Sequence, residues 1–259
     1  MDWPCPEAIP AQNLSNPERL TRHWTAASLL PMKTFGLPML MTCLVLAWPL
    51  WADVSAVGRL ENTSTNQTCT GTLVAPNVVL SAAHCAGALR DAPDTEAAQV
   101  VFRPGGLGGT VAFKVTNRVT HPFFAQPLAA NGWKLRFDMA LFALESDVPE
   151  TLARPMPPGP EARLGVTLFL VSWRARASAP PRQRACDVID GISGLVTVAC
   201  AVLGGESGAP LLRKTPSGLE LVAVLSSRSQ QRKQPVALAS NVALRLGPLL
   251  DALRSADGS

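Results

Sequence analysis

The chain has 259 residues, of which 47% are hydrophobic and 16% are charged, so it can bury the core of one large or two modest domains. This composition excludes a disordered protein. The net charge is only +4 and aromatic residues make up 5%, so the sequence shows no sign of a nucleic-acid binding surface.

Residues 32–52 have the parts of a secretory signal peptide. They start with Met32 and Lys33, continue with an apolar run and end on the small residue Ala52. The run contains two prolines and is slightly shorter than the roughly 20 residues of a membrane helix. We predict cleavage after Ala52, with a cut after Ala47 or an uncleaved anchor as alternatives. Residues 1–31 are then an over-extended N-terminus, with Met32 as the true start.

Four of the six cysteines remain once residues 1–52 are removed. An even number in an exported chain indicates disulfides, and four cysteines allow three connectivities. We expect Cys69–Cys85 and Cys186–Cys200, because each pair is close in sequence and flanks a candidate catalytic residue.

Short apolar or alternating runs, separated by Gly, Pro, Asn and Asp, fill the chain after Asp53, as is typical of strands in a β-barrel or β-sandwich. The first half has runs at 70–74, 78–81, 98–102, 110–115 and 137–144, and the second at 165–173, 185–189, 195–199, 210–213, 219–226 and 235–239. A proline-rich connector, 149–162, lies between them. The sequence therefore predicts two β domains, 53–148 and 163–259.

Histidine is scarce, because only His84 and His121 lie in the part of the chain expected to fold. His84 ends an apolar run between small residues and Cys85, a setting that holds an imidazole rigidly. His121 precedes a proline and two phenylalanines, which indicates a structural role in a turn. With no paired Cys or His ligand spacing, we expect no metal site and no cofactor.

Residues 203–210 place Ser207 among glycines, just before an apolar run. Glycines at this density allow strained turns and leave amide hydrogens uncovered. The amides of Gly205 and Ser207 can then point together at a developing oxyanion. An ordinary glycine turn is the alternative that this segment alone leaves open.

A nucleophilic serine needs a base and a carboxylate that orients the base. An α/β-hydrolase is excluded, because no histidine follows Ser207. A subtilisin-like order would need an acid before His84. The acids there are Asp53 and Glu61, and the residues around them do not favour a catalytic role. Asp138 lies between apolar residues, and a buried acid needs a hydrogen-bonding partner. The order His, Asp, Ser remains, although a turn or cap is the commoner use of such an acid.

The chain ends in an amphipathic run that predicts a helix. We expect Ser240 or Asn241 as its N-cap, and an interruption near its first turns at Gly247 and Pro248. Two basic clusters elsewhere stand among Ser, Gln and Pro, which predicts solvated loops first and an anion-binding patch second. They are Arg174, Arg176, Arg182 and Arg184, and Arg228, Arg232 and Lys233.

Three segments, 69–85, 137–141 and 205–210, resemble the signature blocks of trypsin-like serine proteases of the chymotrypsin fold, particularly the short secreted bacterial ones. The resemblance covers 57–253, and the spacing 85 − 69 = 16 matches the family's disulfide beside its histidine loop. It implies two six-stranded antiparallel β-barrels, with the site in the cleft between them. It also implies that His84 is the general base, Asp138 orients it, Ser207 attacks the scissile carbonyl, and the Gly205 and Ser207 amides form the oxyanion hole.

Glu206 stands where animal trypsins carry an aspartate that pairs with the freshly cut N-terminus. The chain has no Ile-Val-Gly-Gly start, so we predict that activation does not rest on such an ion pair and that removal of the signal peptide suffices.

Four residues are expected to bind substrate: Ala201, Val202, Ser226 and Arg228. Ala201, six residues before Ser207, replaces the aspartate with which trypsins bind Lys or Arg. Arg228 follows a run that resembles the strand pairing with the substrate backbone. We expect a preference for small or apolar residues before the cut, with an acidic preference, helped by Arg228, as the alternative.

The sequence therefore predicts a secreted, periplasmic or extracellular serine endopeptidase that hydrolyses proteins or peptides through an acyl-enzyme. We expect a monomer with no stable membrane insertion after signal cleavage. The alternative is a catalytically inactive homologue that uses the double barrel as a peptide- or protein-binding module.

Overall fold

A computed structural model describes residues 53–89, 100–105, 109–125, 133–173, 181–192, 194–231 and 233–257. The expected signal peptide and the residues before it lie outside these ranges. Among the described helices, none is long and apolar enough to cross a membrane.

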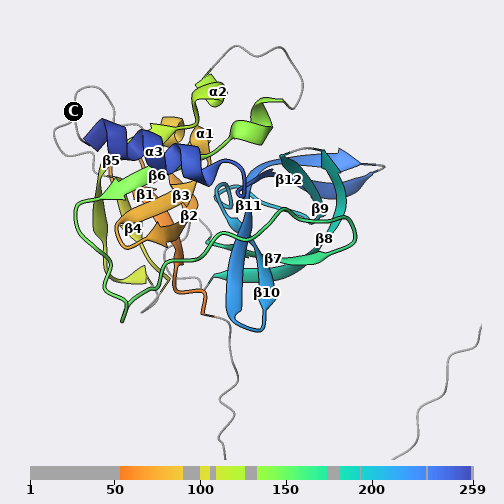
Figure 1. The fold of residues 1–259 in the computed structure, drawn as a ribbon, viewed down its shortest axis with the longest axis horizontal. Coiled ribbons are helices and arrows are strands. Elements are labelled where there is room, and N and C mark those ends of the chain that lie inside the picture. Colours follow the sequence, from red (N-terminus) through yellow and green to blue (C-terminus); the bar gives the residue numbers. More distant parts are fainter. Residues whose placement is uncertain are drawn as a thin grey trace, which may run out of the picture. The chain divides into compact units, whose positions relative to one another are not determined.

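The strands of the described residues form two closed antiparallel barrels, each with six strands (Figure 1). The first has the order β1-β2-β3-β6-β5-β4 and consists of β1 (Val57–Asn62), β2 (Thr68–Ala75), β3 (Val78–Ser81), β4 (Val100–Arg103), β5 (Phe113–Thr120) and β6 (Ala140–Leu144). The second has the order β10-β11-β12-β9-β8-β7 and consists of β7 (Thr167–Ser172), β8 (Arg182–Ile192), β9 (Leu195–Ala199), β10 (Pro210–Thr215), β11 (Gly218–Gln231) and β12 (Gln234–Asn241). The predicted fold class is confirmed.

β1 is a strand that the sequence did not predict. Its burial does not alternate, because Arg59 is buried next to Leu60. The Arg59 guanidinium lies 2.9 Å from the Glu61 carboxylate and 5.5 Å from the centre of the Trp173 ring. A buried arginine that is paired in this way interrupts the hydrophobic pattern by which a strand is recognised.

The C-terminal helix begins later than predicted. Ser240 and Asn241 end β12, and α3 spans Leu246–Asp257. Pro248 therefore falls in the first turn of α3, where its missing N–H would have no partner within the helix. Apolar side chains of α3, among them Leu249 and Leu253, join the core of the first barrel. The helix consequently returns the end of the chain to the first barrel, where it lies along β5 and β6 (Figure 1).

Hydrogen bonds join the two barrels at the starts of β1 and β2. The backbone N–H of Trp173 donates to Thr70 Oγ1 over 3.0 Å, and its indole N–H donates to the Val57 carbonyl over 2.9 Å. The Thr70 N–H in turn donates to the Ser207 carbonyl over 2.8 Å. These bonds set β2 of the first barrel directly against the Ser207 turn of the second.

His121 is buried between β5 and α2 (Pro122–Ala125), in an aromatic cluster rather than in the candidate site. Its ring centre lies 4.8 Å from that of Phe137 and 5.7 Å from that of Phe123. Its Nδ1 accepts a hydrogen bond from the Phe123 N–H over 3.3 Å. Burial lowers the pKa of His121 below its ordinary value of 6.5, and the charge of Arg245 lowers it further.

The fold should lose stability as the pH falls below about 6.5, because the unfolded chain then binds the His121 proton more readily than the folded chain does. Each unit by which the pKa is lowered corresponds to about 1.4 kcal/mol at pH values below both pKa values. A His121→Gln variant, unfolded in urea at pH 7.5 and 5.0, is expected to show a smaller loss than the wild type. An equal loss in both proteins would contradict this account.

Candidate active site

His84 is held by short-range structure on the first barrel. It follows β3 as the second residue of α1 (Ala83–Ala88), and the next residue, Cys85, forms a disulfide with Cys69 of β2. Because the disulfide ties α1 to β2, the imidazole has a fixed place at the end of the barrel. About a third of the His84 side chain is exposed, so the ring borders solvent.

Asp138 lies against His84 and is almost completely buried, at 1% exposure. Its carboxylate accepts the His84 backbone N–H at Oδ1 over 2.8 Å, and its Oδ2 lies 2.7 Å from the His84 Nδ1. The Ser226 hydroxyl of β11 also donates to Oδ2. Since a carboxylate only accepts, Nδ1 of the neutral ring carries the proton and Nε2 keeps its lone pair. The arrangement can therefore present a base at Nε2.

Ser207 lies in a turn between two glycines with positive φ, Gly205 at +87° and Gly208 at +78°. A side chain at Gly208 would also collide with the Ser81 hydroxyl and the Thr70 carbonyl, at 2.0 and 2.3 Å. The Gly208 N–H donates to the Leu225 carbonyl over 2.9 Å. Only glycine fits this position, and the turn is pinned between the two barrels.

The amides of this turn form a candidate anion site. Within the described residues, the N–H groups of Gly205 and Ser207 donate to no acceptor, whereas the Glu206 N–H donates to the Leu203 carbonyl over 3.3 Å. Two amides on either side of Glu206 thus remain able to donate to a ligand. This is the donor arrangement that stabilises oxyanions in acyl transfer.

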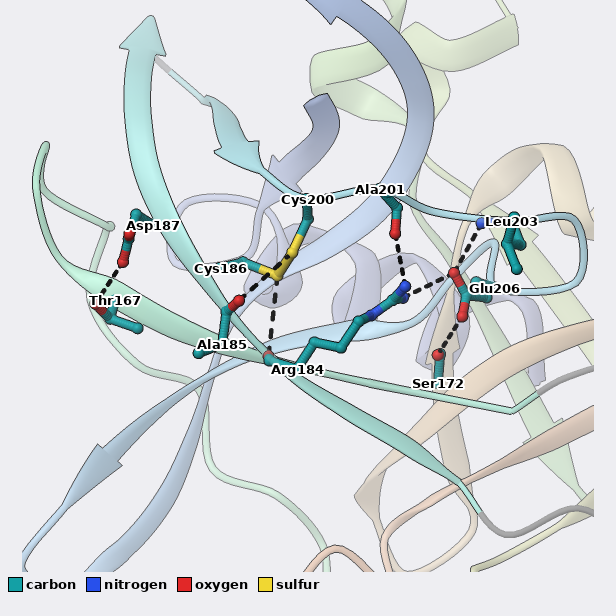
Figure 2. Close-up of a disulfide and its surroundings, with 10 residues drawn as sticks. All are labelled: Thr167, Ser172, Arg184, Ala185, Cys186, Asp187, Cys200, Ala201, Leu203 and Glu206. Carbon is teal, nitrogen blue, oxygen red and sulfur yellow. Dashed lines mark hydrogen bonds and ion pairs between the residues drawn. A yellow bond between two sulfur atoms is a disulfide. The ribbon is translucent and has the colours of Figure 1, made fainter. Parts of the chain in front are cut away.

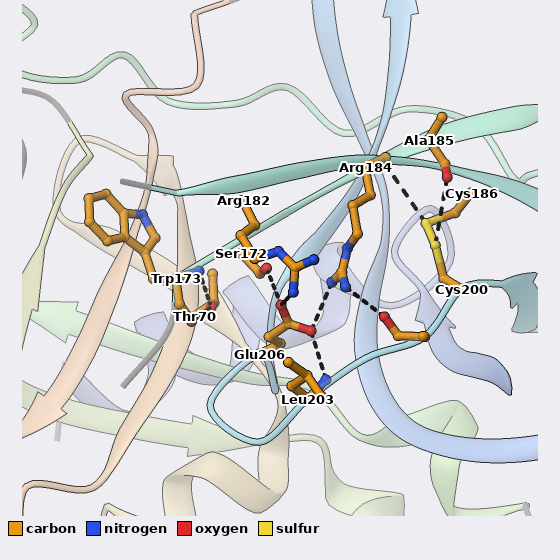
Figure 3. Close-up of polar contacts among 11 residues, drawn as sticks. Thr70, Ser172, Trp173, Arg182, Arg184, Ala185, Cys186, Cys200, Leu203 and Glu206 are labelled. Carbon is orange, nitrogen blue, oxygen red and sulfur yellow. Dashed lines mark hydrogen bonds and ion pairs between the residues drawn. A yellow bond between two sulfur atoms is a disulfide. The ribbon is translucent and has the colours of Figure 1, made fainter. Parts of the chain in front are cut away.

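Glu206 is completely buried and pairs with Arg184 of β8, a partner that the sequence analysis missed (Figures 2 and 3). Arg184 Nη2 donates to Glu206 Oε2 over 2.8 Å, as does the Leu203 N–H. The Ser172 hydroxyl donates to Oε1 over 2.9 Å, and the Arg182 guanidinium lies 4.0 Å away. Glu206 therefore has an internal cationic partner.

The pKa of Glu206 reflects this pairing. Burial by itself would raise the pKa, but the hydrogen bonds from Arg184, Leu203 and Ser172, with the charge of Arg184, together lower it below the ordinary value of 4.5. The buried acid is therefore held as a carboxylate, directly next to Ser207.

The expectation that Arg182 and Arg184 lie in a solvated loop is wrong. Both belong to β8, and both side chains point toward Glu206 (Figure 3). Arg184 shares a face of the strand with the buried Cys186 and Val188, because side chains two residues apart point the same way. The alternation 184, 186, 188 was the signal in the sequence that could have placed Arg184 inward.

The second disulfide lies beside this ion pair and joins Cys186 of β8 to Cys200, which follows β9 (Figure 2). Arg184 Nη1 donates to the carbonyl of the next residue, Ala201, over 2.6 Å. The disulfide and Arg184 thus hold both the start and the end of the segment 200–206, which leads into the Ser207 turn.

A cavity of about 250 Å³ opens beside Ser207. It is lined by Val202, Leu203, Gly204, Ser207, Leu225, Ser226, Ser227 and Arg228. A neighbouring cavity of about 350 Å³ is lined by Ala201, Val202, Arg228, Ser229, Gln230, Pro235 and Val236.

The two cavities together contain all four residues expected to bind substrate. Val202, Ser226 and Arg228 share the first cavity with Ser207, whereas Ala201 lines only the second. Ser226 also has a bond that the sequence analysis missed, because its hydroxyl donates to Asp138. One residue of β11 thus joins the His84–Asp138 pair to the cavity that Ser207 borders.

Comparison with known proteins agrees with the double-barrel fold. The family model described as Trypsin matches residues 46–245, which is most of the chain. The solved structure of a Glu endopeptidase in complex with MPD has a similar fold, with a TM-score of 0.60 and 15% sequence identity, over 80% of this chain and 93% of that one. No curated protein sequence matches the chain. The match to the family model, together with the double barrel, shows that the chain belongs to the trypsin family and is a serine-type endopeptidase.

Proposed function

We propose that the chain is an exported endopeptidase that cleaves peptide bonds with a triad of His84, Asp138 and Ser207. The observation that carries this proposal is the bond from Ser226 to Asp138, because Ser226 and Ser207 line one cavity while Asp138 holds the His84 ring. Membership of the trypsin family makes peptides or proteins the substrates.

In the proposed reaction, the Ser207 hydroxyl attacks the carbonyl carbon of the scissile bond and gives its proton to His84 Nε2. The carbonyl oxygen becomes an oxyanion that accepts hydrogen bonds from the Gly205 and Ser207 amides. His84 then donates the proton to the leaving amine as the C–N bond breaks, which leaves an ester on Ser207. Water then gives a proton to His84 and attacks the ester carbonyl. As the C–O bond to Ser207 breaks, His84 returns the proton to the Ser207 oxygen, which releases the acid product and restores the enzyme. Asp138 keeps the proton on Nδ1 and stabilises the imidazolium throughout.

We also propose that the mature chain starts at Asp53 and works as a monomer in the periplasm or outside the cell, without stable membrane insertion. Its first barrel would then occupy 53–148 and its second 163–259, on either side of the connector 149–162. The apolar run before Ala52 and the two disulfides, which fit an oxidising compartment, support export.

Labelling with a serine-directed fluorophosphonate tests the proposed function. The disulfide-bonded mature protein is expected to take up one probe per chain, and Ser207→Ala is expected to take up none. Ser255→Ala, which removes an exposed hydroxyl on α3, is the matched control and should label fully. Sequencing of the labelled protein from its N-terminus is expected to begin at Asp53.

One outcome would contradict the proposed function, and another would contradict the expected start at Met32. A correctly disulfide-bonded wild type that takes up no probe would favour the binding module. Peptides from residues 1–31 in the expressed protein would show that this segment is translated.

A further inference from the structure

Among the described residues, one charged residue, Arg228, lines the two cavities, of which the first borders Ser207. The other residues lining either cavity are apolar, glycine, serine or glutamine, and no Asp or Glu is among them. Arg228 lines both cavities, which also share Val202. A side chain that enters the first cavity from the scissile bond at Ser207 therefore meets the Arg228 guanidinium whether it stops there or extends into the second.

The carboxylate directly beside Ser207, that of Glu206, is already neutralised. Glu206 is completely buried, lies 2.8 Å from the Arg184 guanidinium and has the Arg182 guanidinium at 4.0 Å. Arg184 also donates to the Ala201 carbonyl at the edge of the second cavity. Two guanidinium groups thus face one carboxylate behind the cavity wall, which leaves no negative charge for a third cation.

Arg228 itself forms no ion pair with any described carboxylate, and its side chain lies exposed at the cavity. Its backbone carbonyl accepts a hydrogen bond from the Ser227 hydroxyl over 3.3 Å. This bond therefore involves the main chain of Arg228 and not its guanidinium. An apolar substrate side chain would displace water from the guanidinium and would supply no hydrogen-bond acceptor in its place. A lysine or arginine would meet a like charge, whereas a carboxylate can accept two parallel hydrogen bonds from a guanidinium.

We propose that Arg228 is a specificity residue and that this endopeptidase prefers substrates with Asp or Glu immediately before the scissile bond. The inference rests on the proposed function and names its substrate class. It reverses the order of the two preferences in the sequence analysis, because Arg228 lines both cavities and has no carboxylate partner within the described residues.

A matched set of peptide p-nitroanilides tests this inference. The peptides differ only in the residue before the cut, which is Glu, Asp, Ala, Leu or Lys. For the mature wild type, kcat/KM for the Glu or Asp peptide is expected to exceed that for Ala or Leu by about tenfold or more, as for a charged hydrogen bond. The Lys peptide should be the poorest substrate, and added salt should reduce the acidic preference.

Variants of Arg228 separate its charge from its bulk. Arg228→Gln should lose the acidic preference while it still cleaves the Ala and Leu peptides, and Arg228→Lys should keep part of the preference. Arg228→Glu should move the preference toward Lys. Arg254→Gln, which removes an exposed guanidinium on α3, is the matched control and should leave the profile unchanged.

Fluorophosphonate labelling of every variant gives the concentration of active enzyme and separates two kinds of failure. A labelled wild type that cleaves Ala or Leu peptides as fast as Glu peptides would overturn the specificity inference and leave the proposed function standing. The same holds if Arg228→Gln keeps the acidic preference. A wild type that takes up no probe would overturn both.

Discussion

Replacing Asp138 by asparagine is expected to lower kcat by about four orders of magnitude, as for the equivalent change in other triads. The carboxylate accepts three hydrogen bonds, from the His84 backbone, the His84 ring and Ser226. Asparagine has one oxygen, and when this oxygen accepts the His84 backbone N–H, its NH₂ group faces Nδ1. Nδ1 must then be the acceptor, so the ring proton moves to Nε2 and His84 cannot take the proton of Ser207.

The measurement is kcat on a good peptide substrate at pH 7.5, corrected for active enzyme. Asp147→Asn is the matched control, because Asp147 is exposed and follows β6 on the same barrel. Near-ultraviolet circular dichroism checks that both variants fold. A folded Asp138→Asn enzyme with nearly full kcat would exclude the proposed role of Asp138.

Replacing Arg184 by methionine is expected to destabilise the protein by about 3–5 kcal/mol, because Glu206 would remain as a buried carboxylate without its partner. The double variant Arg184→Met with Glu206→Gln should regain much of this stability, because no uncompensated charge remains. The matched control is Arg213→Met, which breaks a more exposed pair with Glu220 on the same barrel. It should cost about 1 kcal/mol or less.

The pH dependence of the Arg184→Met variant provides a second readout. In the wild type the pKa of Glu206 lies below 4.5, so its contribution to stability is present above pH 4.5 and is lost as the pH falls through the lower folded-state value. In the variant, burial is no longer offset by Arg184 and the pKa of Glu206 rises. The difference in urea midpoint should therefore be largest near pH 7.5 and shrink toward pH 4.5. A constant difference would mean that the ion pair is not its source.

Much of the fold was accessible to sequence reasoning, because strands have a local signature. The runs at 78–81 and 195–199 coincide with β3 and β9. Prediction failed where a polar residue is buried by a distant partner, as in β1, where Arg59 packs against Trp173. It also failed at the start of α3, because β12 continues to Asn241 to pair with β11.

For the candidate site, too, sequence reasoning found the residues that local signals mark and missed the partners that are distant in the chain. The scarcity of histidine and the order of polar residues along the chain were enough to single out His84, Asp138 and Ser207 as candidates. The sequence analysis placed Ser226 only in a substrate strand and Arg184 in a loop. Their partners are 88 and 22 residues away in the chain.

By itself, the sequence determined the all-β class and the residues able to carry the chemistry, because strand alternation and residue type are local properties. Only the tertiary structure decided which of these residues meet. Closure of the two barrels brings Ser226 to Asp138 and Arg184 to Glu206, and it places Arg228 at both cavities, whose described lining residues include no carboxylate. Electrostatic and hydrogen-bond partnerships depend on distances of a few ångströms between remote segments, and these distances are set by packing.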